Sequence, residues 1–275
     1  MTTIQAIILG LIQGFTEFLP VSSSGHLVLA QHFFGLKGDL LTFDIFLHFG
    51  TLLAVVAVFY RTIISILVSS IKGLRSILTG TDSCSQVYHN SRDIRMAVAI
   101  VAGTIPAVII GLTLKDPIEA LFSSVVPVLA ALAVTGVMLL ATFFVRPGEE
   151  QVGLRRGIMI GIAQAIAIIP GISRSGATIS AALFLKVDRK TTGEFSFLLS
   201  IPAIAGATVL ALKDVADGLS SLPPSAIILG ILASFLSGFF SLVLLMEIIR
   251  RGKIGYFGFY CLAVSVAGFG YVFLK

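Results

Sequence analysis

The 275-residue chain is 56% hydrophobic and only 12% charged, whereas a soluble globular domain has roughly 25% charged residues. With a mean hydropathy of +1.03, this composition excludes an ordinary soluble domain and indicates an integral membrane protein. The net charge of +5 does not indicate nucleic-acid binding, because basic residues in membrane proteins gather in cytoplasmic loops. The only two cysteines, Cys84 and Cys261, lie in a polar loop and an apolar run, so no disulfide is predicted.

Six apolar segments approach or exceed the length of about 20 residues that a helix needs to cross a bilayer. These segments cover residues 43–60, 96–114, 121–145, 195–212, 225–249 and 254–274. Polar residues, prolines or glycines separate them. The longest separator, 69–93, contains several charged side chains and is predicted to be a surface loop.

Two further apolar regions, 3–36 and 154–186, are too long for a single span, since each would form a helix of roughly 50 Å. Proline with serine and glycine interrupts each region near its middle, at 20–25 and 170–176. Proline breaks a helix by removing a backbone donor and clashing with the preceding turn. Each region is therefore predicted to be a helical hairpin with two arms of about 16 residues.

The two halves of the chain are similar to each other. A shift of 151 residues, without a gap, superposes Gly10 on Gly161, Gln13 on Gln164, Ser22 on Ser173, Ser24 on Ser175 and Gly25 on Gly176. Three predicted spans follow each hairpin, and because three is odd, the second half must be inverted relative to the first. We predict one all-α polytopic membrane domain over 1–275, with inverted repeats 1–145 and 154–275, each a re-entrant hairpin plus three transmembrane helices.

The basic residues predict the orientation. Fourteen fall on one side of the predicted membrane, and four fall on the other: Lys37, Lys115, Lys213 and Lys275. The positive-inside rule makes the richer side cytoplasmic, so both termini are predicted to face outward. The two hairpins come from opposite faces, and their turns meet only if each stops midway, where irregular backbone needs a buried or watered cavity.

The two turns carry groups that suit an anion. The second arm of each hairpin begins at its turn, so the free N–H groups and positive dipole end of that arm point towards the midplane. Two such helix N-termini make a site that suits phosphate. Further donors are predicted from the hydroxyls of Ser22, Ser23, Ser24, Ser173, Ser175 and Thr178. The glycines Gly25, Gly171 and Gly176 would allow close approach to the backbone.

Three ionisable residues, Glu17, His26 and Arg174, lie among these groups. Charges at membrane depth are costly unless paired or hydrated, so they mark functional sites by default. The planar fork of Arg174 can hold phosphate oxygens. Glu17 can bind a divalent cation or act as a base, and His26 can shuttle a proton near neutral pH.

Structural explanations compete with these functional ones. Serine and glycine clusters often mark only close helix packing, although two clusters in register with Glu, His and Arg favour a site. For Gln13 and Gln164, an interhelical hydrogen bond is an equally good explanation. His48 and Asp44, at the outer end of a span, are predicted to be solvated at the interface.

The stretches 13–26 and 170–178 resemble the two signatures of the undecaprenyl-diphosphate phosphatases, the bacitracin-resistance family. The stretches 103–107 and 194–199 are also similar to this family, and the resemblance runs over nearly the whole chain. One position departs from the commonest pattern, because many members have Glu where this chain has Gln13. The glutamine leaves one carboxylate fewer for a metal ion.

The resemblance implies a bacterial plasma-membrane enzyme that removes the terminal phosphate of undecaprenyl diphosphate with Mg²⁺ or Ca²⁺. This reaction recycles the lipid carrier of peptidoglycan synthesis and confers bacitracin resistance. The resemblance assigns the catalytic core to Glu17, His26 and Arg174, and phosphate or metal contacts to Ser22, Ser23, Ser24, Ser173 and Ser175. The expected partners are a polyprenyl diphosphate lipid and the bilayer, without nucleic acid, and a homodimer is left open.

The mechanistic hypothesis places the diphosphate in an outward-facing cavity that opens on the periplasmic side. His26 or Glu17 activates the nucleophile, which is either water or the hydroxyl of Ser23. Glu17 is the expected metal ligand, with Gln13 as the weaker candidate. The alternative function is a lipid-phosphate flippase or transporter, for which an inverted repeat is typical, whereas the Glu/His pair favours chemistry.

Overall fold

The computed structural model describes residues 1–36, 40–114, 117–118, 121, 124–146, 148–214 and 223–274. Within these ranges the chain is helical and forms no β-strand, apart from one isolated bridge between Glu150 and Val187. Six described helices are long and apolar enough to cross a membrane. The predicted class, an all-α protein with six spans, is confirmed.

The six long helices are α3 (Leu41–Leu78), α5 (Arg92–Thr113), α7 (Val125–Ala141), α10 (Arg189–Asp214), α11 (Pro224–Arg250) and α12 (Tyr256–Phe273). The shorter ones are α1 (Thr3–Phe18), α2 (Ser23–Phe33), α4 (Cys84–Asn90), α8 (Leu154–Ile166), α9 (Arg174–Phe184) and the 3₁₀ turn η1 (Thr142–Phe144). Both cysteines are free, as predicted.

The two predicted hairpins are the pairs α1–α2 and α8–α9, and their breaks fall at the predicted proline turns. Their arms contain 16, 11, 13 and 11 residues, so three arms are shorter than the predicted 16. The second arms are short because each begins only after a serine N-cap, Ser22 or Ser173. Each arm is shorter than the roughly 17–25 residues of a full span.

The predicted surface loop at 69–93 is wrong. Helix α3 continues to Leu78, and only a short turn separates it from α4. One side of this helix faces α5, because Ser65 and Ser69 donate hydrogen bonds to Asp93 of α5 at 2.5 and 3.1 Å. The opposite face exposes the apolar side chains Ile64, Leu67, Ile71, Leu74 and Leu78. This spacing of three and four residues is helical.

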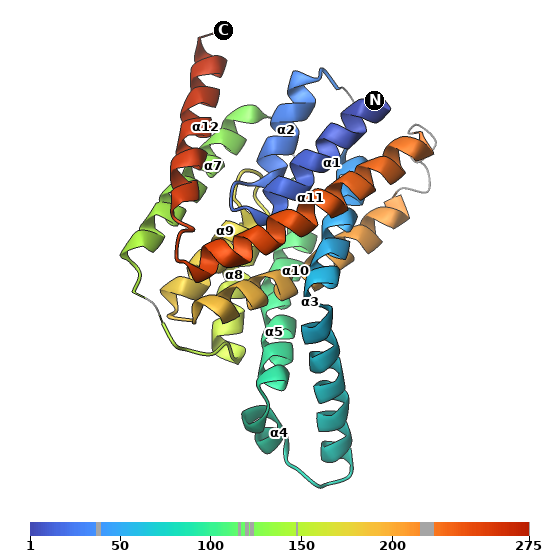
Figure 1. Cartoon of the computed structure of the whole chain (residues 1–275), viewed down its shortest axis with the longest axis vertical. Helices are drawn as coiled ribbons and strands as arrows, with labels where there is room; N and C mark the ends of the chain where they lie inside the picture. Colours follow the sequence, from blue (N-terminus) through green and yellow to red (C-terminus); the bar gives the residue numbers. More distant parts are fainter. Residues whose placement is uncertain are drawn as a thin grey trace.

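Pairs of helices cross closely where small residues allow their backbones to touch. Helix α1 packs along α11, α8 along α5, and α7 along α12, and the last pair stands side by side at one edge of Figure 1. A Cβ atom on Gly14 would lie 2.5 Å from the Ser234 carbonyl oxygen. The outer faces carry exposed leucine, isoleucine, valine and phenylalanine side chains, as lipid contact requires.

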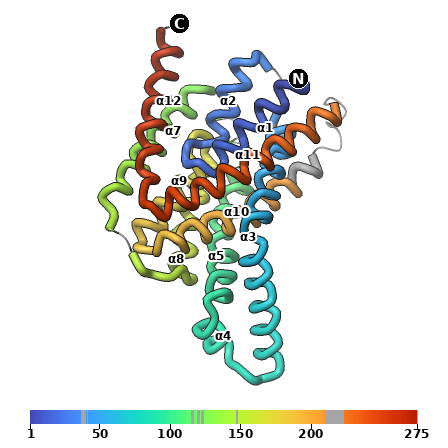
Figure 2. The backbone as a smooth tube through the Cα atoms, viewed as in Figure 1, coloured from blue at the N-terminus to red at the C-terminus, as the bar shows by residue number. Residues whose placement is uncertain are grey.

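The N- and C-termini lie at one end of the molecule and α4 lies at the opposite end (Figures 1 and 2). This arrangement matches an even number of crossings. Of the four lysines assigned to the outer side, Lys37, Lys115 and Lys275 lie outside the described residues, and the side chain of Lys213 is not described. The sides of the membrane therefore stay a prediction.

Candidate active site

The turns of the two hairpins contact each other. Arg174, the first residue of α9, forms an ion pair with Glu17 in the last turn of α1. The Gly171 N–H group donates to Ser24 Oγ at 3.5 Å. The structure thus brings together the two motifs that lie about 150 residues apart.

Glu17 is the centre of this contact and is only 7% exposed. Its Oε1 atom accepts from Arg174 Nη2. Its Oε2 atom accepts from Ser23 Oγ at 2.5 Å and from Gln13 Nε2 at 3.0 Å. A buried carboxylate needs such partners, because an unpaired charge out of water is strongly destabilising. Glu17, Ser23, Arg174 and Gln13 therefore form one connected polar cluster.

His48 of α3 joins this cluster, a contact that the prediction of interfacial solvation did not include. Its Nε2 atom lies 3.4 Å from Glu17 Oε2, and its Nδ1 atom donates to the Asp44 carbonyl oxygen at 2.7 Å. The side chain is 29% exposed and connects the buried carboxylate with the surface. The available sequence signal was a single ionisable residue in the second turn of an apolar helix, which marks function by default.

His26 lies apart from the Glu17 cluster. Its Nδ1 atom lies 2.8 Å from the Ser22 carbonyl oxygen, and its Nε2 atom lies 2.8 Å from the Tyr260 hydroxyl of α12. A carbonyl only accepts, so Nδ1 carries the proton. Within the described residues, the hydrogen bonds of these side chains do not join His26 to Glu17 or Ser23. The site therefore has two parts, one around Glu17 and one around His26.

Several of the predicted hydroxyls hold the helix starts. Ser22 Oγ accepts from the Gly25 N–H at 3.3 Å, and Ser173 Oγ accepts from the Gly176 N–H at 3.1 Å. These are N-cap bonds, which satisfy backbone donors at the start of α2 and α9. Thr178 is fully buried and donates to the Arg174 carbonyl oxygen of its own helix. Two other serines contact the caps: Ser24 lies 3.3 Å from Ser22 and Ser175 lies 3.2 Å from Ser173.

Helices α7 and α12 form hydrogen bonds with the turns of the two hairpins. Thr135 of α7 donates to the Gly171 carbonyl oxygen at 3.1 Å and accepts from the Ser173 N–H at 3.0 Å. Cys261 of α12 lies with its Sγ atom 3.5 Å from the Pro20 carbonyl oxygen. Gly171 has a φ of +96° and no room for a Cβ atom against Val128, so this position requires glycine.

Some buried polar atoms of the cluster are free. Among the described residues, Arg174 Nη1 and Gln13 Oε1 are buried without a hydrogen-bond partner. Unpaired buried polar atoms are rare in folded proteins, and these two could bond a ligand. The interhelical hydrogen bonds considered as one explanation of the two glutamines are absent from the described part of the chain. Gln13 bonds Glu17 in its own helix, and neither amide atom of Gln164 has a partner there.

The oxygen atoms near Glu17 fit a hard divalent cation. Such ions take oxygen ligands, and Mg²⁺ is usually bound through one or two carboxylates together with phosphate oxygens and water. Glu17 supplies one carboxylate, and Gln13, whose Nε2 group bonds that carboxylate, has an Oε1 atom without a partner among the described residues. The described residues contain no cluster of three or more His, Cys, Asp or Glu side chains that could hold a metal. The donor set thus suits an ion shared with a phosphate, rather than one enclosed by protein ligands.

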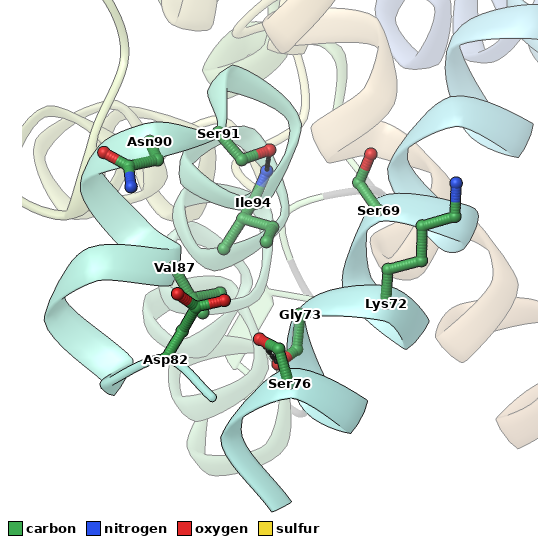
Figure 3. Close-up of a pocket in the computed structure, with 9 residues that line it drawn as sticks. All are labelled: Ser69, Lys72, Gly73, Ser76, Asp82, Val87, Asn90, Ser91 and Ile94. Atoms are coloured by element: carbon green, nitrogen blue, oxygen red, sulfur yellow. Dashed lines mark hydrogen bonds between the residues drawn. The ribbon is translucent and has the colours of Figure 1, made fainter. Parts of the chain in front are cut away.

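A hollow of about 340 Å³ lies far from this cluster, between α3, α4 and α5. Figure 3 shows Lys72 and Gly73 of α3 on one side of it and Val87 and Asn90 of α4 on the other. It contains none of the predicted site residues, so it is not the candidate active site.

The fold and the cluster define a class: a multi-pass helical membrane protein with a polar site where two broken helices meet. The sequence model of the family described as "Bacitracin resistance protein BacA" matches residues 6–267. The chain belongs to this family.

Three curated relatives are named undecaprenyl-diphosphatase. The protein of Desulforapulum autotrophicum is 46% identical, over 98% of this chain and 99% of the relative. The protein of Desulfosudis oleivorans is 45% identical, over 95% of each chain. The protein of Treponema denticola is 40% identical, over 97% of this chain and 96% of the relative.

The hydroxyl of Thr135 gives a prediction for the second turn. Replacing Thr135 with Val leaves the buried Ser173 N–H without an acceptor, at a cost of about 1–3 kcal/mol. The matched control is Thr208→Val, because the Thr208 hydroxyl is also buried but donates only to a carbonyl of its own helix. Thermal unfolding in detergent should show a clear loss for Thr135→Val and little change for Thr208→Val. Equal losses would mean that Thr135 does not support the turn.

Proposed function

We propose that this chain hydrolyses undecaprenyl diphosphate to undecaprenyl phosphate and inorganic phosphate in a bacterial plasma membrane. The observation that carries the proposal is the contact of the Ser23 hydroxyl with Glu17, which is buried and paired with Arg174 between two helix N-termini. The names of the relatives support the substrate. The product is the carrier lipid of cell-wall synthesis, whose supply accounts for bacitracin resistance.

The diphosphate is bound by positive groups from both halves. Arg174 Nη1 is buried without a partner among the described residues and can donate a hydrogen bond to a phosphate oxygen. The N-terminal ends of α2 and α9 add the positive ends of their helix dipoles. A phosphate competes with Glu17 for Arg174, because guanidinium pairs with either anion. Binding of the substrate therefore releases the Glu17 carboxylate from its ion pair.

The released carboxylate acts as the base. Glu17 takes the proton of Ser23, and Ser23 Oγ forms a bond to the terminal phosphorus as the bond to the bridging oxygen breaks, so that undecaprenyl phosphate leaves. Water then hydrolyses the phosphoserine, which frees phosphate and restores the hydroxyl. Positioned donors stabilise the charge of the transferring phosphoryl group, which is the main contribution in such reactions.

Mg²⁺ or Ca²⁺ is the proposed cofactor. Glu17 and Gln13 would hold it, and the bound ion would neutralise negative charge on the diphosphate. Gln13 already orients Glu17 through its Nε2 group.

The proposal also includes the architecture. The two halves are inverted repeats, both termini lie outside, and the site opens to the periplasm. Two equivalent contacts support it, since α1 of the first half packs on α11 of the second, and α8 of the second packs on α5 of the first. Each turn is also contacted by the last helix of the other half. Thr135 of α7 contacts Gly171 in the second turn, and Cys261 of α12 contacts Pro20 in the first turn. A homodimer stays a prediction.

The first test is phosphate release from a C55 diphosphate by the purified protein, in detergent and in lipid, with and without EDTA. The wild type should release phosphate, and EDTA should reduce the rate. Loss of the base in Glu17→Gln, or of the nucleophile in Ser23→Ala, should lower the rate by about 10²–10⁴-fold. Arg92→Gln is the matched charge control, because Arg92 pairs with Glu194 away from the cluster.

Acid quenching of the reaction should also trap a phosphoserine at Ser23, seen by mass spectrometry. A normal rate of phosphate release in Ser23→Ala would mean that water, and not Ser23, is the nucleophile. No release under any condition would instead favour the flippase function.

The exposed Cys84 tests the orientation without a mutation. Cys84 lies at the start of α4, at the end of the molecule opposite the termini, whereas Cys261 is buried. A membrane-impermeant maleimide should label Cys84 in inside-out vesicles and leave it unlabelled in intact spheroplasts. Labelling in intact spheroplasts would reverse the proposed orientation.

A further inference from the structure

We propose that Tyr260 is a positioning residue for His26, and this proposal rests on the proposed hydrolysis. Tyr260 lies on α12, 234 residues after His26 in the chain, and its hydroxyl lies 2.8 Å from His26 Nε2. The family signatures found in the sequence, at 13–26 and 170–178, do not include this residue. The contact joins the last helix of the chain to the start of α2.

The hydrogen bonds fix both nitrogens of the His26 ring. Nδ1 donates to the Ser22 carbonyl oxygen at 2.8 Å, so in the neutral ring Nε2 is the acceptor and the Tyr260 hydroxyl is the donor. The two rings lie nearly parallel, with centroids 5.7 Å apart and an interplanar angle of 11°. The Ser22 carbonyl thus sets the tautomer of His26, and the Tyr260 hydroxyl holds the orientation of the ring and of its free electron pair.

The backbone on both sides of this contact is held in place. Ser22 has a φ of +69°, a conformation that costs a non-glycine residue of order 1–3 kcal/mol and aims its carbonyl at the His26 ring. On the other side, the neighbouring Cys261 is buried against Pro20, and Ser265 donates to the Leu129 carbonyl oxygen of α7 at 2.8 Å. α12 is therefore anchored to the first turn next to Tyr260.

Packing alone does not explain the tyrosine. Tyr260 is 46% exposed, so much of its ring contributes no burial, and phenylalanine would fill the same space. The hydroxyl is what reaches the imidazole. Because Ser23 already bonds Glu17, the base for the nucleophile is present without His26. His26 can then exchange a proton with the leaving phosphate or with the water that hydrolyses phosphoserine, once its Nε2 atom passes from the Tyr260 hydroxyl to that group.

The test compares phosphate release from the C55 diphosphate by the wild type, Tyr260→Phe and the matched control Tyr256→Phe. Tyr256 lies on the same helix and contacts Phe143 through its ring, so its hydroxyl should be dispensable. Loss of one orienting hydrogen bond should lower the kcat of Tyr260→Phe about 5- to 10-fold and change KM less than about twofold. An unchanged kcat would overturn the proposal.

A double variant distinguishes action through His26 from a general effect. If Tyr260 acts through His26, then Tyr260→Phe should cause no further loss of kcat in a His26→Gln background. A loss as large as in the wild-type background would overturn the proposal. If His26→Gln itself has normal activity, His26 takes no part in the reaction and the proposal fails.

A chemical readout stays informative even without enzymatic activity. Diethyl pyrocarbonate reacts with the free electron pair of a neutral imidazole, which the Tyr260 hydroxyl occupies in the wild type. Mass spectrometry should show faster modification of His26 in Tyr260→Phe, relative to the exposed His32 of the same helix. Equal rates of His26 modification in the wild type and Tyr260→Phe would overturn the contact itself. If these rates differ but the protein releases no phosphate, only the proposed function is overturned.

Discussion

The ion pair between Glu17 and Arg174 is the interaction on which the site depends. Each half of the chain contributes one partner, and both partners lie at the turn of a broken helix. Neither charge is stable alone in a low-dielectric interior, because the desolvation penalty of an unpaired ion is several kcal/mol. The pair therefore requires both hairpins to be in place, and α7 and α12 supply the backbone contacts that keep them there.

The same pair links structure to function. The groups that stabilise the resting Glu17 carboxylate, Arg174 and Ser23, are those that the proposed reaction uses to bind phosphate and to attack it. Arg174 keeps one buried N–H group unpaired among the described residues, so an incoming phosphate finds a donor before it competes for the ion pair. A site of this kind is preorganised, and preorganised electrostatic stabilisation contributes more to catalysis in many enzymes than any other single effect.

Much of the fold could be predicted from the sequence because its signals are local. Prolines mark the two hairpin turns, long apolar runs mark the six spanning helices, and the repeat places Ser22 and Ser173 at equivalent helix starts. The contacts of His48 and Tyr260 could not be predicted, because each depends on how separate helices pack. The segment 69–93 was taken for a loop because of its charged side chains, whereas the bonds of Asp93 to Ser65 and Ser69 of α3 appear only in three dimensions.

The strength of this ion pair is measured by a double-mutant cycle on the unfolding free energy in detergent, with Glu17→Gln, Arg174→Met and the double variant. Each single change leaves one buried charge unpaired, which costs about 3–5 kcal/mol for a fully buried pair. The double change leaves neither charge, so its loss should be smaller than the sum of the single losses by about 0.5–3 kcal/mol. Losses that add to within about 0.5 kcal/mol would contradict the ion pair as the link between the two halves.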